Sequence, residues 1–75
     1  MKYEVGDRVK VNIRNKTSWL KLKDAPATIF YIDHKTLYAH HLRPIQVELD
    51  DPYDEHGQTM LRVSVKEIKP LKIIV

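Results

Sequence analysis

Alternation of apolar and polar residues is the feature that most narrows the folds open to this 75-residue chain. The run VGDRVKVNIR, residues 5–14, places its apolar side chains at odd positions and its basic ones at even positions. Because successive side chains of a strand point to opposite faces, this run predicts a half-buried strand with a basic outer face. The inward residues are Val5, Val9, Val11 and Ile13, and the outward ones are Arg8, Lys10, Asn12 and Arg14.

Two later runs alternate in the same way and predict a hairpin. PIQVEL (residues 44–49) and TMLRVSV (residues 59–65) each carry three inward apolar residues, and Pro44 is expected to open the first of these strands. Between them, DDPYDEHGQ (residues 50–58) combines Asp-Pro, several acids and a glycine, which is typical of a turn. The expected inward residues are Ile45, Val47, Leu49, Leu61, Val63 and Val65.

The remaining segments are less regular. ATIFYID (residues 27–33) has apolar side chains on both faces and predicts a bent strand that contributes to the core twice, through a bulge. Residues 15–24 predict a long loop whose Trp19 folds back onto the core, with Pro26 as a break after it. The segment of residues 33–43 is compatible with a turn, a short strand or one helical turn. Near the end, KEI predicts a 3₁₀ turn, and Pro70 places the final strand at an edge.

Five short strands without a long helix predict an all-β fold, a small antiparallel barrel formed by one domain over residues 1–75. The runs VGDRVKV, ATIFYID, IQVEL and RVSVKEIKPL together resemble the layout of SH3-like barrels. That resemblance implies five strands, a long first loop and a 3₁₀ turn before the last strand. Through GDRVKV and PIQVEL…RVSVKEIKPL, the chain is also similar to small uncharacterised SH3-like proteins of phages and prophages of Gram-positive bacteria.

The composition indicates where such a domain would work. The chain has no cysteine, so it can form neither a disulfide nor a thiolate zinc site, which fits a reducing cytoplasm. No apolar run is long enough to span a membrane, and Met1 is not followed by the apolar core of a signal peptide. We therefore expect a cytoplasmic protein without a membrane partner.

The stretch YAHHLRPIQVELDDPYDEHG, residues 38–57, gathers three histidines and five carboxylates, and so invites a search for a metal or acid–base site. His40 and His41 are adjacent, so on a strand they would point to opposite faces and could not share one ion. Neither Asp50 nor Asp51 begins a run with the ligand and glycine spacing of a calcium loop. We expect no catalytic residue, no metal and no cofactor, and the pattern assigns no role to the two histidines.

Charge distribution carries the leading functional hypothesis. Residues 8–23 hold six basic residues and no acid, although the whole chain has a formal charge of only +3. Lysine and arginine bind phosphates, and an exposed aromatic ring can stack on a base, so this segment predicts a nucleic-acid contact. The alternative is an ordinary solvated face with Trp19 in the core. The predicted contact residues are Arg8, Lys10, Arg14, Lys16, Trp19, Lys21 and Lys23.

Two other functional hypotheses stay open. A protein partner could bind the acidic loop through Tyr53 and Asp54, or the chain could form homo-oligomers through the edge segment KIIV, residues 72–75. More distantly, GDRVKV is similar to the first strand of type II dihydrofolate reductase, an SH3-like enzyme whose active site lies in an oligomeric pore. The Val-Gln-Ile-Tyr active-site run of that family is missing here, and the expected protein is a binding module rather than an enzyme.

Overall fold

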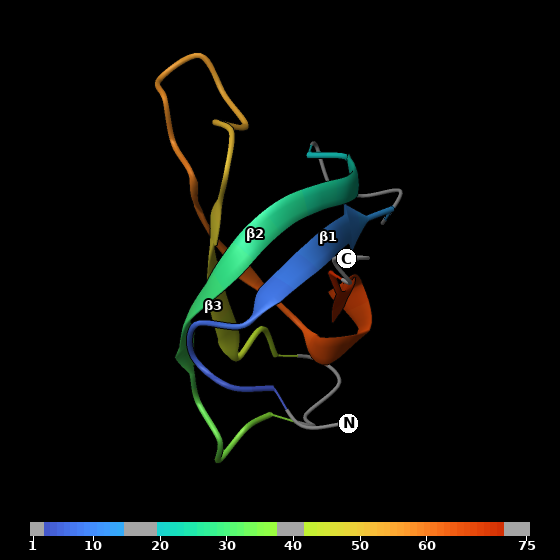
Figure 1. Ribbon diagram of the computed structural model, residues 1–75, viewed down its shortest axis with the longest axis vertical. Coiled ribbons are helices and arrows are strands. Elements are labelled where there is room, and N and C mark those ends of the chain that lie inside the picture. The colour runs from blue at the N-terminus through green and yellow to red at the C-terminus, as the bar shows by residue number, and fades with distance from the viewer. Residues whose placement is uncertain (1–2, 15–19, 38–41, 72–75) are drawn as a thin grey trace, which may run out of the picture.

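The computed structural model describes residues 3–14, 20–37 and 42–71, and these form a single antiparallel sheet (Figure 1). A one-turn 3₁₀ helix, η1 (Val65–Glu67), connects the last two strands. The strand order across the sheet is β4-β3-β2-β1-β5. The predicted all-β class is confirmed, as is the 3₁₀ turn before the last strand. The strands are β1 (Arg8–Ile13), β2 (Leu22–Ile32), β3 (Ile45–Leu49), β4 (Met60–Val63) and β5 (Ile68–Pro70).

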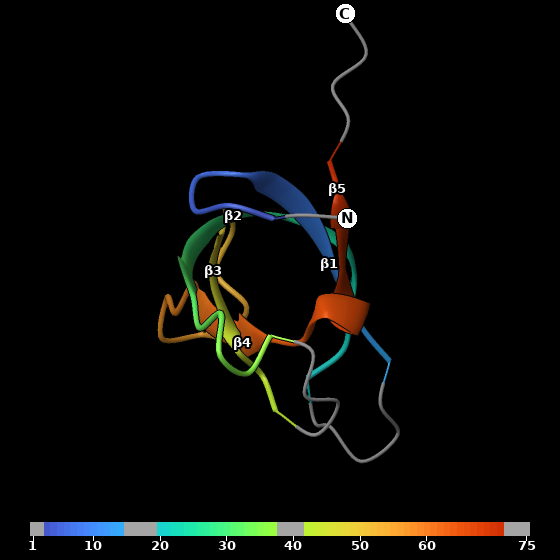
Figure 2. The ribbon, with the colours of Figure 1, turned by 90° about the horizontal axis from the view of Figure 1, so that it is seen from below.

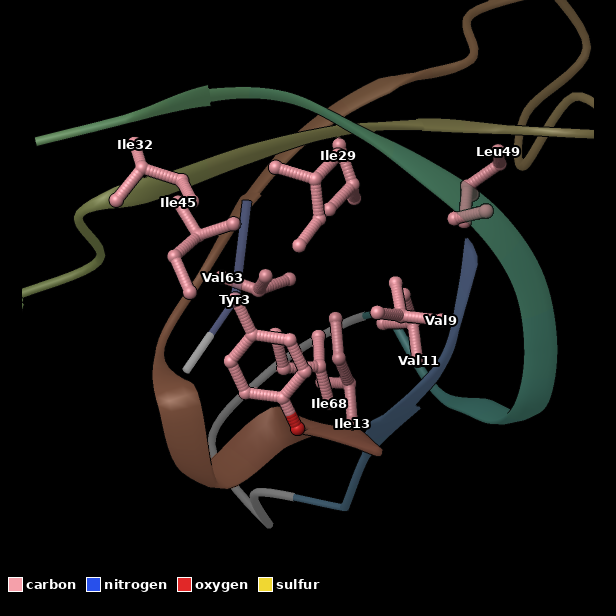
Figure 3. Packing of buried hydrophobic residues seen from close by; sticks show 12 residues of the cluster. Tyr3, Val9, Val11, Ile13, Ile29, Ile32, Ile45, Leu49, Val63 and Ile68 are labelled. Carbon is pink, nitrogen blue, oxygen red and sulfur yellow. The ribbon is translucent and has the colours of Figure 1, made fainter. Parts of the chain in front are cut away.

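The sheet curls strongly, so that one face encloses the core, as the view in Figure 2 shows. Apolar side chains from all five strands point into this space and pack together (Figure 3). In the described part of the chain, β4 and β5 are not paired with each other, so the sheet is open at these two edges. The closed barrel expected from the pattern is therefore not what the sheet shows, because η1 lies between β4 and β5, and β5 pairs with β1 alone among the described strands. The buried residues are Tyr3, Val9, Val11, Ile13, Ala27, Ile29, Ile32, Ile45, Val47, Leu49, Val63 and Ile68.

The alternating runs occupy the faces that their patterns predict, except at Val5 and at Val65, which lies in η1 instead of in β4. The apolar residues of β1 and β3 are buried, whereas Val5 is 62% exposed and not part of the core. Val5 lies in a tight turn, which the Asp7 N–H closes by donating to the Glu4 carbonyl at 3.1 Å. Gly6 supplies the positive φ of 96° that this turn requires. The chain becomes a strand only after the turn, so the alternation cannot be extended back to Val5.

A bulge at Phe30 explains the two-sided apolar pattern of β2. Ile29 lies opposite Val47 while Tyr31 lies opposite Gln46, so β2 has one more residue than β3 at this point. The extra residue lets Ile29 and Ile32 both face the core despite their odd spacing. Phe30 and Tyr31 are 61% and 49% exposed. The predicted bulge is confirmed, but these two aromatic residues do not contribute to the core.

The loop expected over residues 15–24 ends earlier than predicted, because β2 begins at Leu22 and continues through Pro26. The Pro26 carbonyl accepts a hydrogen bond from the Asp50 N–H at 3.0 Å, so it points towards the β3 side. The missing N–H of Pro26 would point the same way, beyond the end of β3. No bond to β1 is lost, and proline is accommodated inside the strand.

Candidate nucleic-acid interface

Arg8 lies on the outer face of β1, but its charge is balanced within the chain. Its Nη1 and Nη2 donate to Asp50 Oδ1 and Oδ2 at 2.7 and 2.5 Å, and Nη1 also donates to Thr28 Oγ1 at 2.8 Å. The hydrogen bond between them raises the pKa of Arg8 and lowers the pKa of Asp50. The acidic stretch that begins at Asp50 thus supplies a counter-charge for the first strand, and Arg8 is not an unpaired cation.

Lys10 continues the outer face of β1 and lies directly opposite Lys69 of β5. Residues opposite each other in an antiparallel pair have side chains on the same face, with Cβ atoms about 4.5–5.5 Å apart. Neither lysine has an ion-pair partner in the part of the chain that the structure describes. Two like charges are therefore held side by side at this edge of the sheet.

Beside these lysines, residues of β1, η1 and β5 and their neighbours line an open surface hollow of about 440 Å³. Among the described residues that line it, Glu67 is the one carboxylate; it accepts the Ser64 N–H at 2.9 Å and lies 3.6 Å from the Nε of Arg43. The three cations of the hollow have no ion-pair partner among the described residues. The lining residues are Asn12, Arg14, Ser64, Lys66, Glu67 and Lys69.

A second hollow, of about 340 Å³, adjoins the first at Arg14, which lines both. It lies where β1 ends and β2 begins, and Lys21 and Lys23 stand beside the apolar Ile13 and Leu22. The structure therefore brings together three of the basic residues that the sequence predicted as contacts, namely Arg14, Lys21 and Lys23. We call Lys10, Arg14, Lys23, Lys66 and Lys69 the β1–β5 basic surface.

Lys66 and Lys69 are not among the contact residues predicted from the sequence. Both lie in the second part of the chain, where acidic residues outnumber basic ones, so the local net charge does not indicate a basic site there. Their position depends on the pairing of β5 with β1, a contact between segments some sixty residues apart. The basic residues of SVKEIKPL, next to the predicted 3₁₀ turn, were the available signal. Two other predicted residues, Lys16 and Trp19, lie outside the described residues.

The second predicted site, Tyr53 and Asp54, lies in the long connection between β3 and β4, which projects from the sheet in Figure 1. Asp54 Oδ1 accepts the N–H groups of His56 and Gln58, each at 3.0 Å. The Tyr53 side chain is partly buried against the core, and its N–H donates to the Gln58 carbonyl at 2.9 Å. Both residues therefore shape the turn, which Gly57 allows with its φ of 78°.

Over residues 3–14, 20–37 and 42–71, no three His, Asp or Glu side chains come close enough together to hold a metal ion. No helix in that same part of the chain is both long and apolar enough to cross a membrane. His40, His41 and the segment of residues 72–75 lie outside the described residues.

Comparison with models of protein families, with curated proteins and with solved structures found no match to this chain.

Proposed function

We propose that this protein is a non-enzymatic binding module that contacts nucleic acid through the β1–β5 basic surface. The observation that carries the proposal is the pairing of Lys10 with Lys69 across two neighbouring strands, without a carboxylate partner among the described residues. Like charges that face each other across a sheet destabilise it, so the stability of the fold does not account for two lysines at these positions. An anionic ligand supplies one.

The shape and charge of this surface favour a polyanion over a single small anion. Five cations extend from the start of β2 across β1 to η1 and β5, over two adjoining hollows. A nucleic acid presents phosphates at regular intervals, and each contact with Lys or Arg releases condensed counterions. Arg8 is left out of this contact because Asp50 already neutralises it.

The fold that we propose for this module is an SH3-like barrel, and we propose a relationship to the small phage and prophage proteins that share this pattern. Support comes from the five antiparallel strands, their curled sheet and the 3₁₀ helix placed before β5. The proposal for nucleic acid is independent of that relationship, because it rests on the charges alone.

Fluorescence anisotropy with a labelled single-stranded oligonucleotide and its duplex, titrated with salt, tests the function. We expect binding at low salt that weakens linearly on a log–log plot. The double variant Lys10→Gln/Lys69→Gln should bind more weakly, with a slope reduced by about 1.4 on a single strand, since each lost contact removes about 0.7.

Lys35→Gln is a matched control, because Lys35 is an exposed lysine in the turn after β2 and lines neither hollow. The control should keep the slope of the native protein. Absence of binding by the native protein at low salt, or an equal loss in the control, would rule out the proposed function.

A further inference from the structure

The side-chain amide of Asn12 is held in one orientation by a bulge at the start of β2. Val11 lies opposite Ala25 and Ile13 opposite Leu22, so β2 carries one residue more than β1 here. Asp24 absorbs the irregularity with a positive φ of 50°, which aspartate tolerates better than most residues. Its N–H then donates to Asn12 Oδ1 at 3.0 Å.

This hydrogen bond determines which half of the Asn12 amide faces the hollow. A backbone N–H requires an acceptor, so Oδ1 must point at Asp24 and the NH₂ group must point away from it. Asn12 lines the hollow of about 440 Å³, and no described residue accepts a hydrogen bond from its Nδ2. Two N–H donors are therefore available beside the cations of the hollow.

The donors in this hollow match the requirements of a phosphate group. The Arg14 guanidinium and the two ammonium groups of Lys66 and Lys69 supply positive charge, and Asn12 adds directed donors. The one carboxylate, Glu67, is already occupied by the Ser64 N–H and by Arg43. A metal cation would meet three positive charges here, whereas a phosphate has acceptor oxygens for several donors at once.

We propose that the hollow between β1, η1 and β5 is a seat for one phosphate group, and that the Asn12 NH₂ donates to a phosphate oxygen there. That the group belongs to a nucleic-acid backbone rests on the proposed function. The seat itself rests on the Asn12–Asp24 hydrogen bond and on the charges around it.

NMR of ¹⁵N-labelled protein titrated with inorganic phosphate at constant ionic strength tests the seat directly. The Asn12 side-chain amide signals should shift and saturate with phosphate but not with chloride. In Asn12→Asp, one carboxylate oxygen still accepts the Asp24 N–H while the two donors become an anionic acceptor. We expect phosphate binding by this variant to be weaker by at least about tenfold.

Gln46→Glu is the matched control, because it makes the same amide-to-carboxylate change in β3, outside the hollow. It should bind phosphate nearly as well as the native protein. Equal phosphate binding by Asn12→Asp and Gln46→Glu, or native Asn12 signals that respond to chloride as they do to phosphate, would overturn the seat. The native Asn12 signals decide the question even if a variant fails to fold.

A parallel titration with a single-stranded oligonucleotide separates the two proposals. Oligonucleotide binding that Asn12→Asp weakens more than Gln46→Glu supports both the seat and a backbone phosphate as its occupant. If the native protein binds phosphate at Asn12 but not the oligonucleotide, the proposed function fails and the seat stands as a site for a free phosphate group. If both variants bind the oligonucleotide equally, the nucleic-acid proposal stands and a backbone phosphate is ruled out as the occupant of the seat.

Discussion

Arg8 and Asp50, 42 residues apart in sequence, form a two-bond ion pair that joins the start of β1 to the end of β3. Thr28 of β2 accepts a third hydrogen bond from the same guanidinium, so the cluster spans three neighbouring strands. The pair affects both charge and fold. It removes one cation from the basic face, and it links the start of the acidic loop to β1.

Arg8→Gln is therefore expected to lower oligonucleotide affinity less than Lys69→Gln does, because it exposes the Asp50 charge but removes no contact with a phosphate. Asp50→Asn should raise the affinity and steepen the salt dependence, because it frees the Arg8 charge. Anisotropy titrations of both variants measure this effect. A loss of affinity in Arg8→Gln as large as that in Lys69→Gln would contradict the assignment of Arg8 to an internal ion pair.

The same pair predicts a pH dependence of stability. Arg8 lowers the pKa of Asp50 below its ordinary value of 3.8, so the folded state binds this proton less readily than the unfolded state. The stabilisation is present above pH 3.8 and is lost as the pH falls through the folded pKa. In urea unfolding at pH 5–6, the native protein should have a higher unfolding free energy than Arg8→Gln. This difference in unfolding free energy should disappear on acidification. A difference that is constant with pH would argue against the ion pair as its source.

Reversing one charge of the Lys10–Lys69 pair should change stability and nucleic-acid affinity in opposite directions. In Lys69→Glu a carboxylate lies opposite Lys10, and such a cross-strand pair contributes roughly 0.2–1 kcal/mol. We expect the unfolding free energy to rise, most at low salt, while nucleic-acid affinity falls. Lys66→Glu makes the same change in charge in η1, outside the strand pairs, and should weaken binding without the gain. Thermal melts and anisotropy on both variants check this.

The bulge in β2 predicts that alanine substitutions at two nearby residues differ sharply in their cost to stability. Ile32→Ala removes a core side chain and should cost about 2–5 kcal/mol, enough to unfold much of a domain this small. Phe30→Ala removes a larger side chain two residues away, yet the change should stay within about 0.5 kcal/mol because that ring is exposed. Chemical denaturation of both variants decides it, and a large loss in Phe30→Ala would show that the ring is packed.

Much of the fold could be predicted because period-two patterns act locally. The inward faces of β1 and β3 follow from alternation alone, and Pro44 and the Asp-Pro turn mark where strands begin and end. The start of β2 could not be predicted, because Pro26 suggests a break unless one knows that β3 ends before reaching it. Closure could not be judged from pattern either, since it depends on whether the two edge strands meet.

The candidate site could likewise be predicted only in part. Arg14, Lys21 and Lys23 are close in sequence, so the charge pattern indicates them, and the pairing of β1 with β2 keeps them together. Lys66 and Lys69 reach the same surface only through the β1–β5 ladder, and the removal of Arg8 requires knowing that Asp50 lies beside it. Long-range pairing determines which cations are paired and which are not, and no local pattern records that pairing.

The basic surface depends on the pairing of β5 with β1. This strand has three residues, pairs only with β1 within the described sheet, and is anchored by the buried Ile68. If β5 separates from β1, Lys69 leaves Lys10 and the hollow loses one wall. A ligand that bridges these residues therefore binds only the closed arrangement and makes local opening of the C-terminal strand rarer. Amide hydrogen exchange in β5 would then slow when an oligonucleotide is bound, while exchange in β3 would not change.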